Sequence, residues 1–374
     1  MYLQRLSLRH FRNLGIQDLQ FPPEGVAIVG DNAQGKSNLL EAIYYLETLR
    51  SFRGARDDQL LAFGEGVFRV AGQLGGGDEG ARDAEVTAAF QRKGKKKKVT
   101  VDGAETDRLG DALGRLAAVV FSPSDVELVS GGPGERRRFL DILLSLNEPG
   151  YLEALQDFRK ILSRRNALLK DEQPSAVIMA WDQGLIRSGA AVTRARQIWV
   201  DARSEAFCEY YAVVSGGHRA SMAYRPSVTL DGADTLDGVA EAYAGALDAT
   251  RERERRVGAT VVGPHRDDVR LRLEDEGDEL DLRDYGSGGQ RRTAALALRL
   301  VEAKTIREAR GQEPIVLLDD VFAELDEGRS ERVLDLMERE ETGQVVLTAP
   351  KDSDVRIRKD ALPRWRIRNG RVVG

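Results

Sequence analysis

The chain has 374 residues, 41% of them hydrophobic, which is enough for one large globular domain plus a smaller inserted or appended one. The single cysteine, Cys208, excludes an internal disulfide framework, and with only three histidines a Cys/His metal site is not expected. No stretch approaches the roughly 20 apolar residues of a membrane span, and no signal-peptide run opens the chain, so we expect a cytoplasmic protein without a membrane partner.

Short apolar runs separated by turn residues predict a series of strands in the first hundred residues. One helix is expected among them, at residues 37–49, where apolar side chains recur on one helical face. Residues 92–95 are expected to close a hairpin, which makes the sheet mixed or antiparallel. The expected strands lie at residues 3–8, 16–21, 26–29, 67–74, 85–91 and 95–102.

After residue 122 the pattern changes to long helical periods, which predict an inserted helical lobe. Its expected helices cover residues 135–146, 150–169 and 177–211. The chain then returns to its first domain through strands at 259–262, 269–273 and 315–318 and a helix at 289–309. We therefore expect an α/β fold with an ATPase domain formed by residues 1–122 and 257–374, and a helical lobe formed by residues 123–256.

A phosphate-binding loop follows the third predicted strand and opens the first helix, matching the pattern G-x-x-x-x-G-K-S/T. Its glycines let backbone N–H groups converge on phosphate oxygens at a helix N-terminus. Lys36 adds positive charge at the β- and γ-phosphates, and the Ser37 hydroxyl can ligate Mg²⁺. The expected ATP-binding residues are Gly30, Asp31, Asn32, Ala33, Gln34, Gly35, Lys36, Ser37 and Asn38.

A carboxylate pair ends the apolar strand at residues 315–318. Such a strand places its last residues beside the phosphate loop, where Asp319 can hold Mg²⁺ and Asp320 can orient or deprotonate the attacking water. Asp320 and Lys36 are thus the expected catalytic residues. Taken alone, the pair is equally well explained by a turn after a buried strand.

A second glycine-rich segment, residues 286–290, directly opens the helix rich in alanine and leucine. It creates another helix N-terminus that can bind an anion. Each chain holds only one γ-phosphate, so this second anion site needs another explanation. The segment is explained if Ser287, Gly289 and Gln290 contact the nucleotide held by a partner copy. The alternative is a glycine-rich helix cap.

The order of these motifs resembles the ABC ATPase superfamily: a phosphate loop, a Ser-x-Gly-Gln signature and, about thirty residues later, a Walker B strand. Within that superfamily the chain is most similar to the RecF family, which is related to SMC heads. The match spans nearly the whole chain. The segments that carry it are residues 8–13, 30–41, 132–141, 263–268 and 317–326.

This resemblance implies an SMC-like head without a long coiled coil, a homodimer that forms on ATP, and binding to duplex DNA near single-strand gaps. It also implies partners: RecR, and indirectly RecO and RecA, which the family helps to load. By the family pattern, Arg12 and Asn13 lie near the nucleotide and Asp326 lies at the dimer interface. Arg53 is a further candidate for a phosphate contact.

The chain departs from the wider ABC pattern in three places. Asp320 stands where transporters usually have glutamate, and residues 348–350 supply no switch histidine. A shorter carboxylate and a missing histidine predict slow hydrolysis. With the DNA-repair function that the resemblance implies, we expect a weak, DNA-dependent ATPase. Residues 122–125 stand where a Q-loop glutamine is usual. His265 lies in a family motif, but a lone histidine in a turn is more often structural than functional.

Basic clusters stand out because the net charge is −5. An acidic total can hide local basic patches, and three of them in one chain favour a polyanionic partner. They lie at residues 92–98, 136–170 and 351–374. The DNA-binding candidates, expected to be exposed, are Arg136, Arg137, Arg138, Lys95 and Lys96.

Two other functions remain open at this point. The chain could be the nucleotide-binding subunit of an ABC transporter, although such a subunit has a short helical subdomain, a Q-loop and a switch histidine. Alternatively, ATP could serve only to hold a DNA clamp closed, with negligible turnover.

Overall fold

The computed structural model describes residues 1–76, 84–275, 278–340, 343–355 and 362–373. The chain divides into two compact units, Met1–Asp125 with Leu296–Gly374, and Val126–Ala295. The first boundary lies three residues from the expected one. The second lies much later than residue 257, because the strand expected at 269–273 in the ATPase domain pairs with a strand of the second unit. No helix among the described residues is long and apolar enough to cross a membrane.

The first unit contains an antiparallel sheet whose strand order is β2-β1-β4-β5-β6-β7. Along β4, exposed and buried residues alternate, so one face packs on the core and the other faces solvent. The predicted hairpin at residues 92–95 is present between β5 and β6. The strands are β1 Tyr2–Arg9, β2 Gln17–Gln20, β4 Val67–Gly75, β5 Ala84–Gln91, β6 Lys96–Val101 and β7 Ala104–Glu105.

A second sheet in the same unit has the order β15-β14-β3-β13-β12-β8, with β14, β3, β13, β12 and β8 parallel and β15 antiparallel. Every residue of β3, β12 and β13 is buried, as expected for parallel strands that are covered on both faces. Its strands are β3 Gly25–Val29, β8 Ala118–Phe121, β12 Ile315–Asp319, β13 Val345–Ala349, β14 Arg364–Arg368 and β15 Arg371–Val373.

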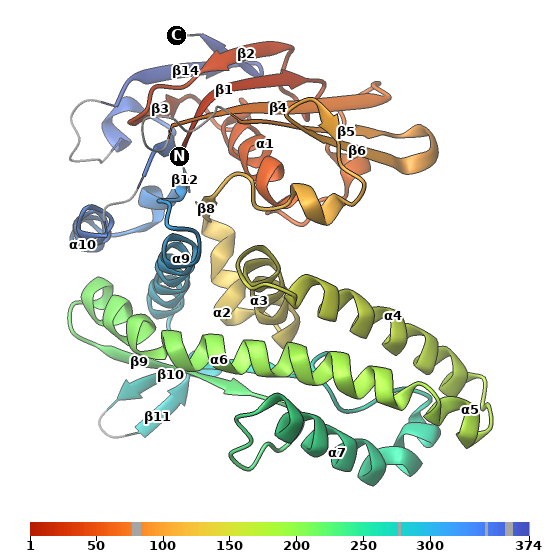
Figure 1. Ribbon diagram of the computed structural model, residues 1–374. Coiled ribbons are helices and arrows are strands. Elements are labelled where there is room, and N and C mark those ends of the chain that lie inside the picture. The colour runs from red at the N-terminus through yellow and green to blue at the C-terminus, as the bar shows by residue number, and fades with distance from the viewer. Residues whose placement is uncertain (77–83, 276–277, 341–342, 356–361, 374) are drawn as a thin grey trace. The chain divides into compact units, whose positions relative to one another are not determined.

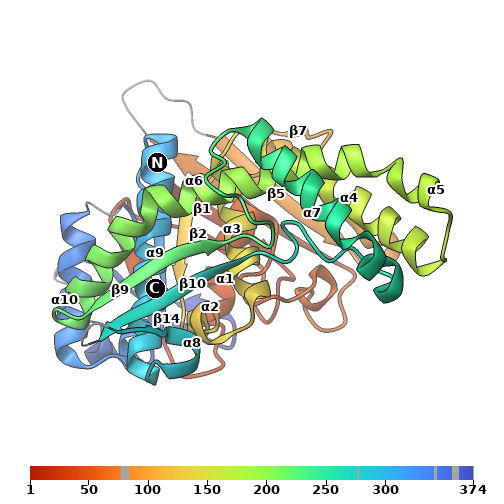
Figure 2. The ribbon, with the colours of Figure 1, turned by 90° about the horizontal axis from the view of Figure 1, so that it is seen from below.

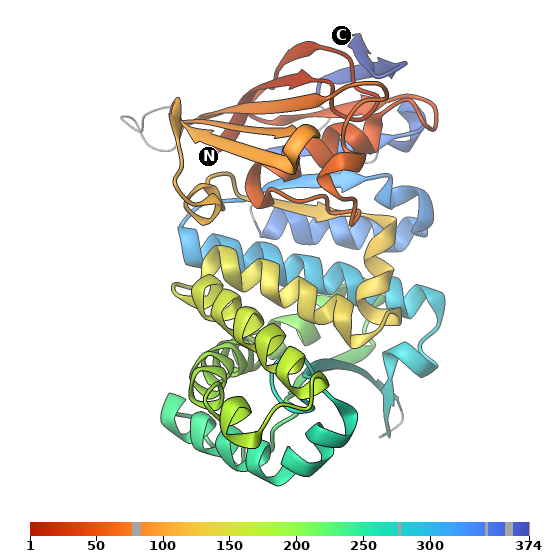
Figure 3. The ribbon, with the colours of Figure 1, turned by 90° about the vertical axis from the view of Figure 1, so that its right-hand side faces the viewer.

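Helix α1, Lys36–Thr48, lies between the two sheets and contacts strands of both (Figure 1, Figure 3). It is buried on nearly all sides, which is typical of a helix in the centre of a core rather than on its surface. Two further helices belong wholly or partly to this unit: α10, Glu327–Arg339, and the later part of α9, Gly288–Arg310. The β3–α1 junction is therefore packed within the core of the first unit.

The second unit is mainly helical and is organised around α6, which runs along β9 and beside α4 and α7 (Figure 2). A three-stranded antiparallel sheet, β11-β10-β9, completes it. Its elements are α2 Glu127–Ser130, α3 Pro133–Asn147, α4 Tyr151–Lys170, α5 Ser175–Met179, α6 Asp182–Ser215, β9 Arg219–Arg225, α7 Leu236–Val257, β10 Asp268–Asp275, β11 Asp278–Asp281 and α8 Leu282–Tyr285.

Two sequence-based predictions in this unit are wrong. The helix expected at 177–211 is two helices, and α6 begins at Asp182, whose buried carboxylate binds arginines from other elements. The strand expected at 259–262 is a loop. Its backbone donors are taken by side chains, since Thr260 N donates to Asn166 Oδ1 at 2.8 Å and Val261 N donates to Glu254 Oε1 at 3.1 Å.

Candidate nucleotide site

The phosphate-binding loop joins β3 to α1, as predicted, and two of its residues have left-handed backbone conformations. Ala33 has φ 64° and Gly35 has φ 110°. A Cβ at position 35 would lie 2.9 Å from Asn13 Oδ1, so only glycine fits there. The loop is thus closely packed against the turn that follows β1.

Lys36 lies at the centre of this loop, with only 4% of its side chain exposed. Its Nζ donates to the carbonyl oxygens of Gly30 at 2.8 Å and Asp31 at 3.3 Å, and lies 3.7 Å from Asp320 Oδ2. The ammonium is therefore fixed by the backbone that surrounds it. A buried cation in this position provides the charge that a polyphosphate requires.

The carboxylates of Asp319 and Asp320 meet Ser37 and Thr348 at the ends of the parallel strands. Ser37 Oγ donates to Asp319 Oδ1 at 2.7 Å. The Thr348 hydroxyl lies 3.1 Å from Asp319 Oδ1 and 3.2 Å from Asp320 Oδ1, and accepts from Asp320 N at 3.0 Å. Thr348 is the first residue of the segment that lacks a switch histidine. Its buried hydroxyl lies between the two carboxylates.

The oxygen atoms of Ser37 and Asp319 fit a magnesium ion, which prefers hard oxygen ligands and completes its shell with water and phosphate oxygens. Burial raises the pKa of Asp319, and the hydrogen bond from Ser37 opposes part of that shift. Among the described residues there is no group of three or more His, Cys, Asp or Glu that could hold a metal without such help. Any ion here would depend on the nucleotide.

Arg12 and Asn13 both lie beside the phosphate-binding loop. Arg12, itself at φ 53°, donates from Nε and Nη2 to both oxygens of the fully buried Glu41, at 2.8 and 2.9 Å. Asn13 Nδ2 donates to Ala33 O at 3.4 Å. Sequence reasoning missed Glu41, although a carboxylate on a buried face of an apolar helix is a signal that a cation must lie opposite.

Asn38 and Arg53 extend this polar chain. Asn38 Nδ2 donates to Asn13 Oδ1 at 2.7 Å, and Arg53 Nη1 donates to Asn38 Oδ1 at 2.8 Å. Arg53 is 44% exposed. One guanidinium is therefore accessible at the edge of the loop, where it could reach a phosphate.

The turn of the C-terminal hairpin β14–β15 also holds the loop and was not predicted to be there. Asn369 N donates to Gln34 Oε1 at 2.6 Å, and Gly370 N donates to Gln34 O at 2.9 Å. Gly370 has φ 72°, and a Cβ there would lie 1.9 Å from Asn13 O. The signal that could have found it is the Asn-Gly dipeptide, which is typical of tight hairpin turns.

Asp125 lies in the segment 122–125, where no Q-loop glutamine was found. Its Oδ1 accepts from Arg299 Nη2 of α9 at 2.6 Å, and its Oδ2 accepts from Ser122 N at 2.7 Å. Arg299 also binds Glu302, at 2.7 Å. A buried ion pair therefore joins this segment to the helix that the signature opens.

The signature segment caps its own helix. Ser287 N donates to Gln290 Oε1 at 2.7 Å, and Gln290 N donates to Ser287 Oγ at 3.2 Å, which is the reciprocal arrangement of a capping box. Ser287 is exposed, and Gly289 lies in the first turn of α9. Asp326 is 59% exposed and caps α10 by accepting from Arg329 N at 2.9 Å.

The predicted DNA-binding residues divide into buried and exposed ones. Arg136 is buried: it makes two hydrogen bonds with the Asp268 carboxylate and donates to three backbone carbonyls, so it is not a surface residue as expected. Arg137 is half-buried and donates to Asp267 O at 2.7 Å. Arg138, Lys95 and Lys96 are exposed.

His265 is held inside the second unit, which fits the structural interpretation of this residue. Its Nε2 lies 3.0 Å from Thr260 O, and its buried Nδ1 has no hydrogen-bond partner within the described part of the chain. Burial lowers its pKa, which favours the neutral ring.

Comparisons with known proteins agree with this architecture. The family model described as "RecF/RecN/SMC N terminal domain" matches residues 2–363. The protein named "DNA replication and repair protein RecF" from Halalkalibacterium halodurans is 38% identical over 341 residues, 89% of each chain, and that from Synechococcus sp. (strain JA-3-3Ab) is 39% identical over 350 residues, 91% of this chain and 90% of the relative.

Solved structures give the same result. "Structure of the recombination mediator protein RecF-ATP in RecFOR pathway" superposes with a TM-score of 0.89 at 32% identity, covering 100% of this chain and 97% of that one. An Smc head bound to the C-winged helix domain of ScpA has a TM-score of 0.56 at 18% identity over 100% and 97% of the two chains, a likeness of fold alone. The fold class predicted from the sequence is therefore confirmed, and the chain belongs to the RecF family of DNA replication and repair proteins.

Proposed function

We propose that the chain is an ATP-dependent DNA-binding protein of recombinational repair. It dimerises on ATP, binds duplex DNA near single-strand gaps, and helps RecR and RecO to load RecA. The observation that carries this proposal is the convergence of the buried Lys36 ammonium, the Ser37–Asp319 pair and Asp320 at one loop. The similarity to a recombination mediator of the RecFOR pathway, solved with ATP, supports the same function.

ATP binds with its phosphates on the loop amides and Lys36, while Ser37 and Asp319 hold the accompanying Mg²⁺. Asp320 takes the proton of the attacking water. To reach that water, its carboxylate must first break its contact with the Lys36 ammonium, which lies 3.7 Å away. Aspartate has a shorter reach than glutamate, and Thr348 is not a base. Hydrolysis is therefore slow, and we expect DNA to stimulate it.

Dimerisation completes each site with the partner's signature. Ser287 and Gly289 begin an exposed helix N-terminus, which suits the γ-phosphate of a nucleotide held by a second copy. Gln290 then gives up its hydrogen bond with Ser287 N, and its side chain turns toward the partner's nucleotide. The exposed Asp326 joins the same two-fold contact.

DNA binds to exposed cations, for which Lys95, Lys96 and Arg138 are the candidates that remain. A protein that acts on chromosomal gaps works in the cytoplasm of a bacterium. RecR is the direct partner in this proposal, and RecO and RecA act through it.

Sedimentation with and without ATP tests the composite site. Ser287→Arg should bind ATP nearly as the parent does but fail to dimerise, because the bulky side chain blocks the closure in which each copy completes the other's site. Asp320→Asn should instead hold the dimer closed, since uncleaved ATP keeps stabilising the associated state.

Thr235→Arg is the matched control, because Thr235 is an exposed cap of a different helix, α7, and accepts from Gly238 N at 3.1 Å. It should dimerise as the parent does. Parental dimerisation and hydrolysis in Ser287→Arg would show that residues 286–290 are only a helix cap. Negligible turnover in the parent, with normal dimerisation, would leave ATP as a clamp without catalysis.

A further inference from the structure

A straight row of cations crosses the solvent face of the antiparallel sheet. The strand register places Arg9 of β1 opposite Arg69 of β4, Arg69 opposite Ala89 of β5, and Ala89 opposite Lys98 of β6. Arg9, Arg69 and Lys98 are exposed, and we call these three residues the basic row. Because neighbouring strands lie about 4.8 Å apart, the row is about 14 Å long.

The basic row is incompletely neutralised within the protein. The Arg9 side chain makes no hydrogen bond or salt bridge with a described residue, and the Arg69 side chain donates only to the Thr87 hydroxyl, at 3.4 Å. Lys98 pairs with Glu105, but both side chains are more than half exposed, so this bond is weak and exchangeable. Like charges directly opposite each other on a sheet cost stability, so the protein retains a pair that its own fold does not need.

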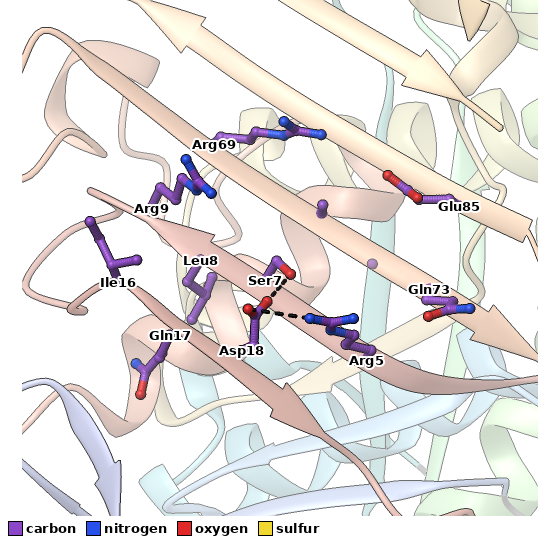
Figure 4. Close-up of a pocket in the computed structure, with 12 residues that line it drawn as sticks. Arg5, Ser7, Leu8, Arg9, Ile16, Gln17, Asp18, Arg69, Gln73 and Glu85 are labelled. Carbon is purple, nitrogen blue, oxygen red and sulfur yellow. Dashed lines mark hydrogen bonds and ion pairs between the residues drawn. The ribbon is translucent and has the colours of Figure 1, made fainter. Parts of the chain in front are cut away.

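A groove of about 300 Å³ lies beside the row on the same face (Figure 4). Its floor includes Ala71, which lies on the solvent face of β4 and whose small side chain leaves room above the backbone. Arg5, Arg9 and Arg69 line it. Two carboxylates, Asp18 and Glu85, also line this groove. Asp18 binds Arg5 at 3.3 Å and Ser7, and its charge also attracts Arg9, whereas Glu85 accepts from the Thr87 hydroxyl, so the arginine pair is only partly neutralised.

Further cations extend the basic surface along β6 toward the β5–β6 turn. The next cross-strand position brings Lys96 opposite Gln91, and the β5–β6 turn adds Arg92, Lys93 and Lys95, all exposed. The basic surface therefore runs from the end of β1 to the tip of this hairpin, and includes two of the lysines selected from sequence.

We propose that the basic row is a track on which the first unit holds the sugar-phosphate backbone of duplex DNA. This inference rests on the proposed DNA-binding function and gives it a location. Phosphates follow one another by about 3.4 Å along the axis on one strand, so a row of about 14 Å faces several of them. Guanidinium groups suit this contact because their paired N–H donors match phosphate oxygens.

The test measures binding of a duplex of about 30 base pairs to the ATP-bound protein while the salt concentration is varied. In Arg9→Gln/Arg69→Gln, the slope of log affinity against log salt should become shallower by about 1.8, because each lost phosphate contact removes about 0.9. Affinity at low salt should fall by about tenfold or more. Arg9→Lys/Arg69→Lys keeps both charges and should keep the parental slope.

Arg115→Gln is the matched control, because Arg115 is an exposed arginine of the same unit outside this sheet face. The double glutamine variant should still dimerise on ATP and should melt at or above the parental temperature, since a like-charge pair is gone. If the double variant does not fold, Arg9→Gln alone should change the slope by about 0.9.

Three outcomes would overturn the inference in distinguishable ways. If the parent binds no duplex, the proposed DNA function fails. If the parent binds duplex and the glutamine variant binds it with the same slope, the function stands and the DNA lies elsewhere. If labelled polyglutamate of similar charge binds the parent more tightly than duplex at equal salt, the basic row serves an acidic protein instead.

Discussion

Charged side chains have different roles in the two units of this protein. Around the phosphate-binding loop, several remain accessible: Asp320 is 28% exposed, Arg12 21% and Arg53 44%. In the second unit, Arg165 and Arg196 are 1% and 2% exposed and are surrounded by partners. Both regions carry arginine and aspartate within motifs. Accessibility, rather than residue type, separates a site for a ligand from a structural network.

The network of the second unit is built on two buried arginines. Arg165 donates to Asp182, Glu254 and the Thr260 hydroxyl, each at 2.8 or 2.9 Å. Arg196 donates to Asp141 at 2.7 Å and to Pro264 O at 2.7 Å. Their partners come from helices far apart in sequence and from the 263–268 motif. Through Pro264, this motif therefore helps to stabilise the lobe.

The largest effect should come from breaking that network with Arg165→Met. Glu254 would lose its arginine partner and Asp182 would keep only Arg251, which costs about 3–5 kcal/mol of unfolding free energy. Denaturant unfolding measures it. Arg159→Met is the matched control, because Arg159 pairs with Asp141 at 2.7 Å but is 55% exposed, and such pairs contribute about 1 kcal/mol or less. Similar losses in both variants would contradict the contrast drawn between buried and exposed pairs.

Lys36→Met should weaken ATP binding. We expect ATP affinity to fall by about a hundredfold or more, near 2.7 kcal/mol, because the loop loses its buried ammonium near the phosphates, and ATP-dependent dimerisation should fail with it. Calorimetric titration measures the loss. Lys97→Met removes another partly buried lysine, bound to Asp57 at 3.0 Å, and should leave ATP binding unchanged. Parental dimerisation of Lys36→Met with ATP would refute the assigned loop.

The sequence predicted the elements around Lys36 better than those of the lobe, and the reason is physical. The phosphate loop, the strand before Asp319 and the signature are contiguous segments, so local pattern defines them. The Arg12–Glu41 pair and the contact of Asn369 with Gln34 join residues distant in sequence, and periodicity carries no such information.

Residues 136–138 show a prediction that helix geometry could have corrected. Successive residues on a helix point about 100° apart, so three arginines in a row on α3 span about 200°, and on a helix that packs over half of its circumference one of them turns toward the buried side. Arg136 faces the buried side and Arg138 the exposed one. A charge run is therefore a poor guide to a binding surface, whereas cross-strand register, as in the basic row, is available only from the structure.

Gly370→Ala should have an intermediate effect, because it should lower both the stability of the fold and the affinity for ATP. The added Cβ would overlap Asn13 O at 1.9 Å and must also adopt φ 72°, so we expect a loss of about 1–3 kcal/mol in stability and severalfold weaker ATP binding. Gly232→Ala has a similar φ, 83°, but its Cβ meets no atom within 4 Å. That control should show only the conformational cost and parental ATP binding. Equal behaviour of the two would mean that the hairpin turn does not hold the loop.

The smallest effect concerns Glu47 of α1, which is buried in the first unit yet is not part of the phosphate site. Burial raises its pKa to about 8 from 4.5, although Arg310 lies 3.4 Å away and opposes the shift. The folded state therefore keeps a proton that the unfolded state releases, so stability is fully present below pH 4.5 and is lost as pH rises toward 8. One such group contributes at most about 1.4 kcal/mol per pH unit.

Glu47→Gln should flatten the fall in unfolding free energy between pH 4.5 and 8. Glu338→Gln, at an exposed residue of α10, should preserve that fall. An unchanged slope in Glu47→Gln would show that Arg310 keeps this carboxylate ionised in the folded state, as Arg299 does for Asp125 in the same unit.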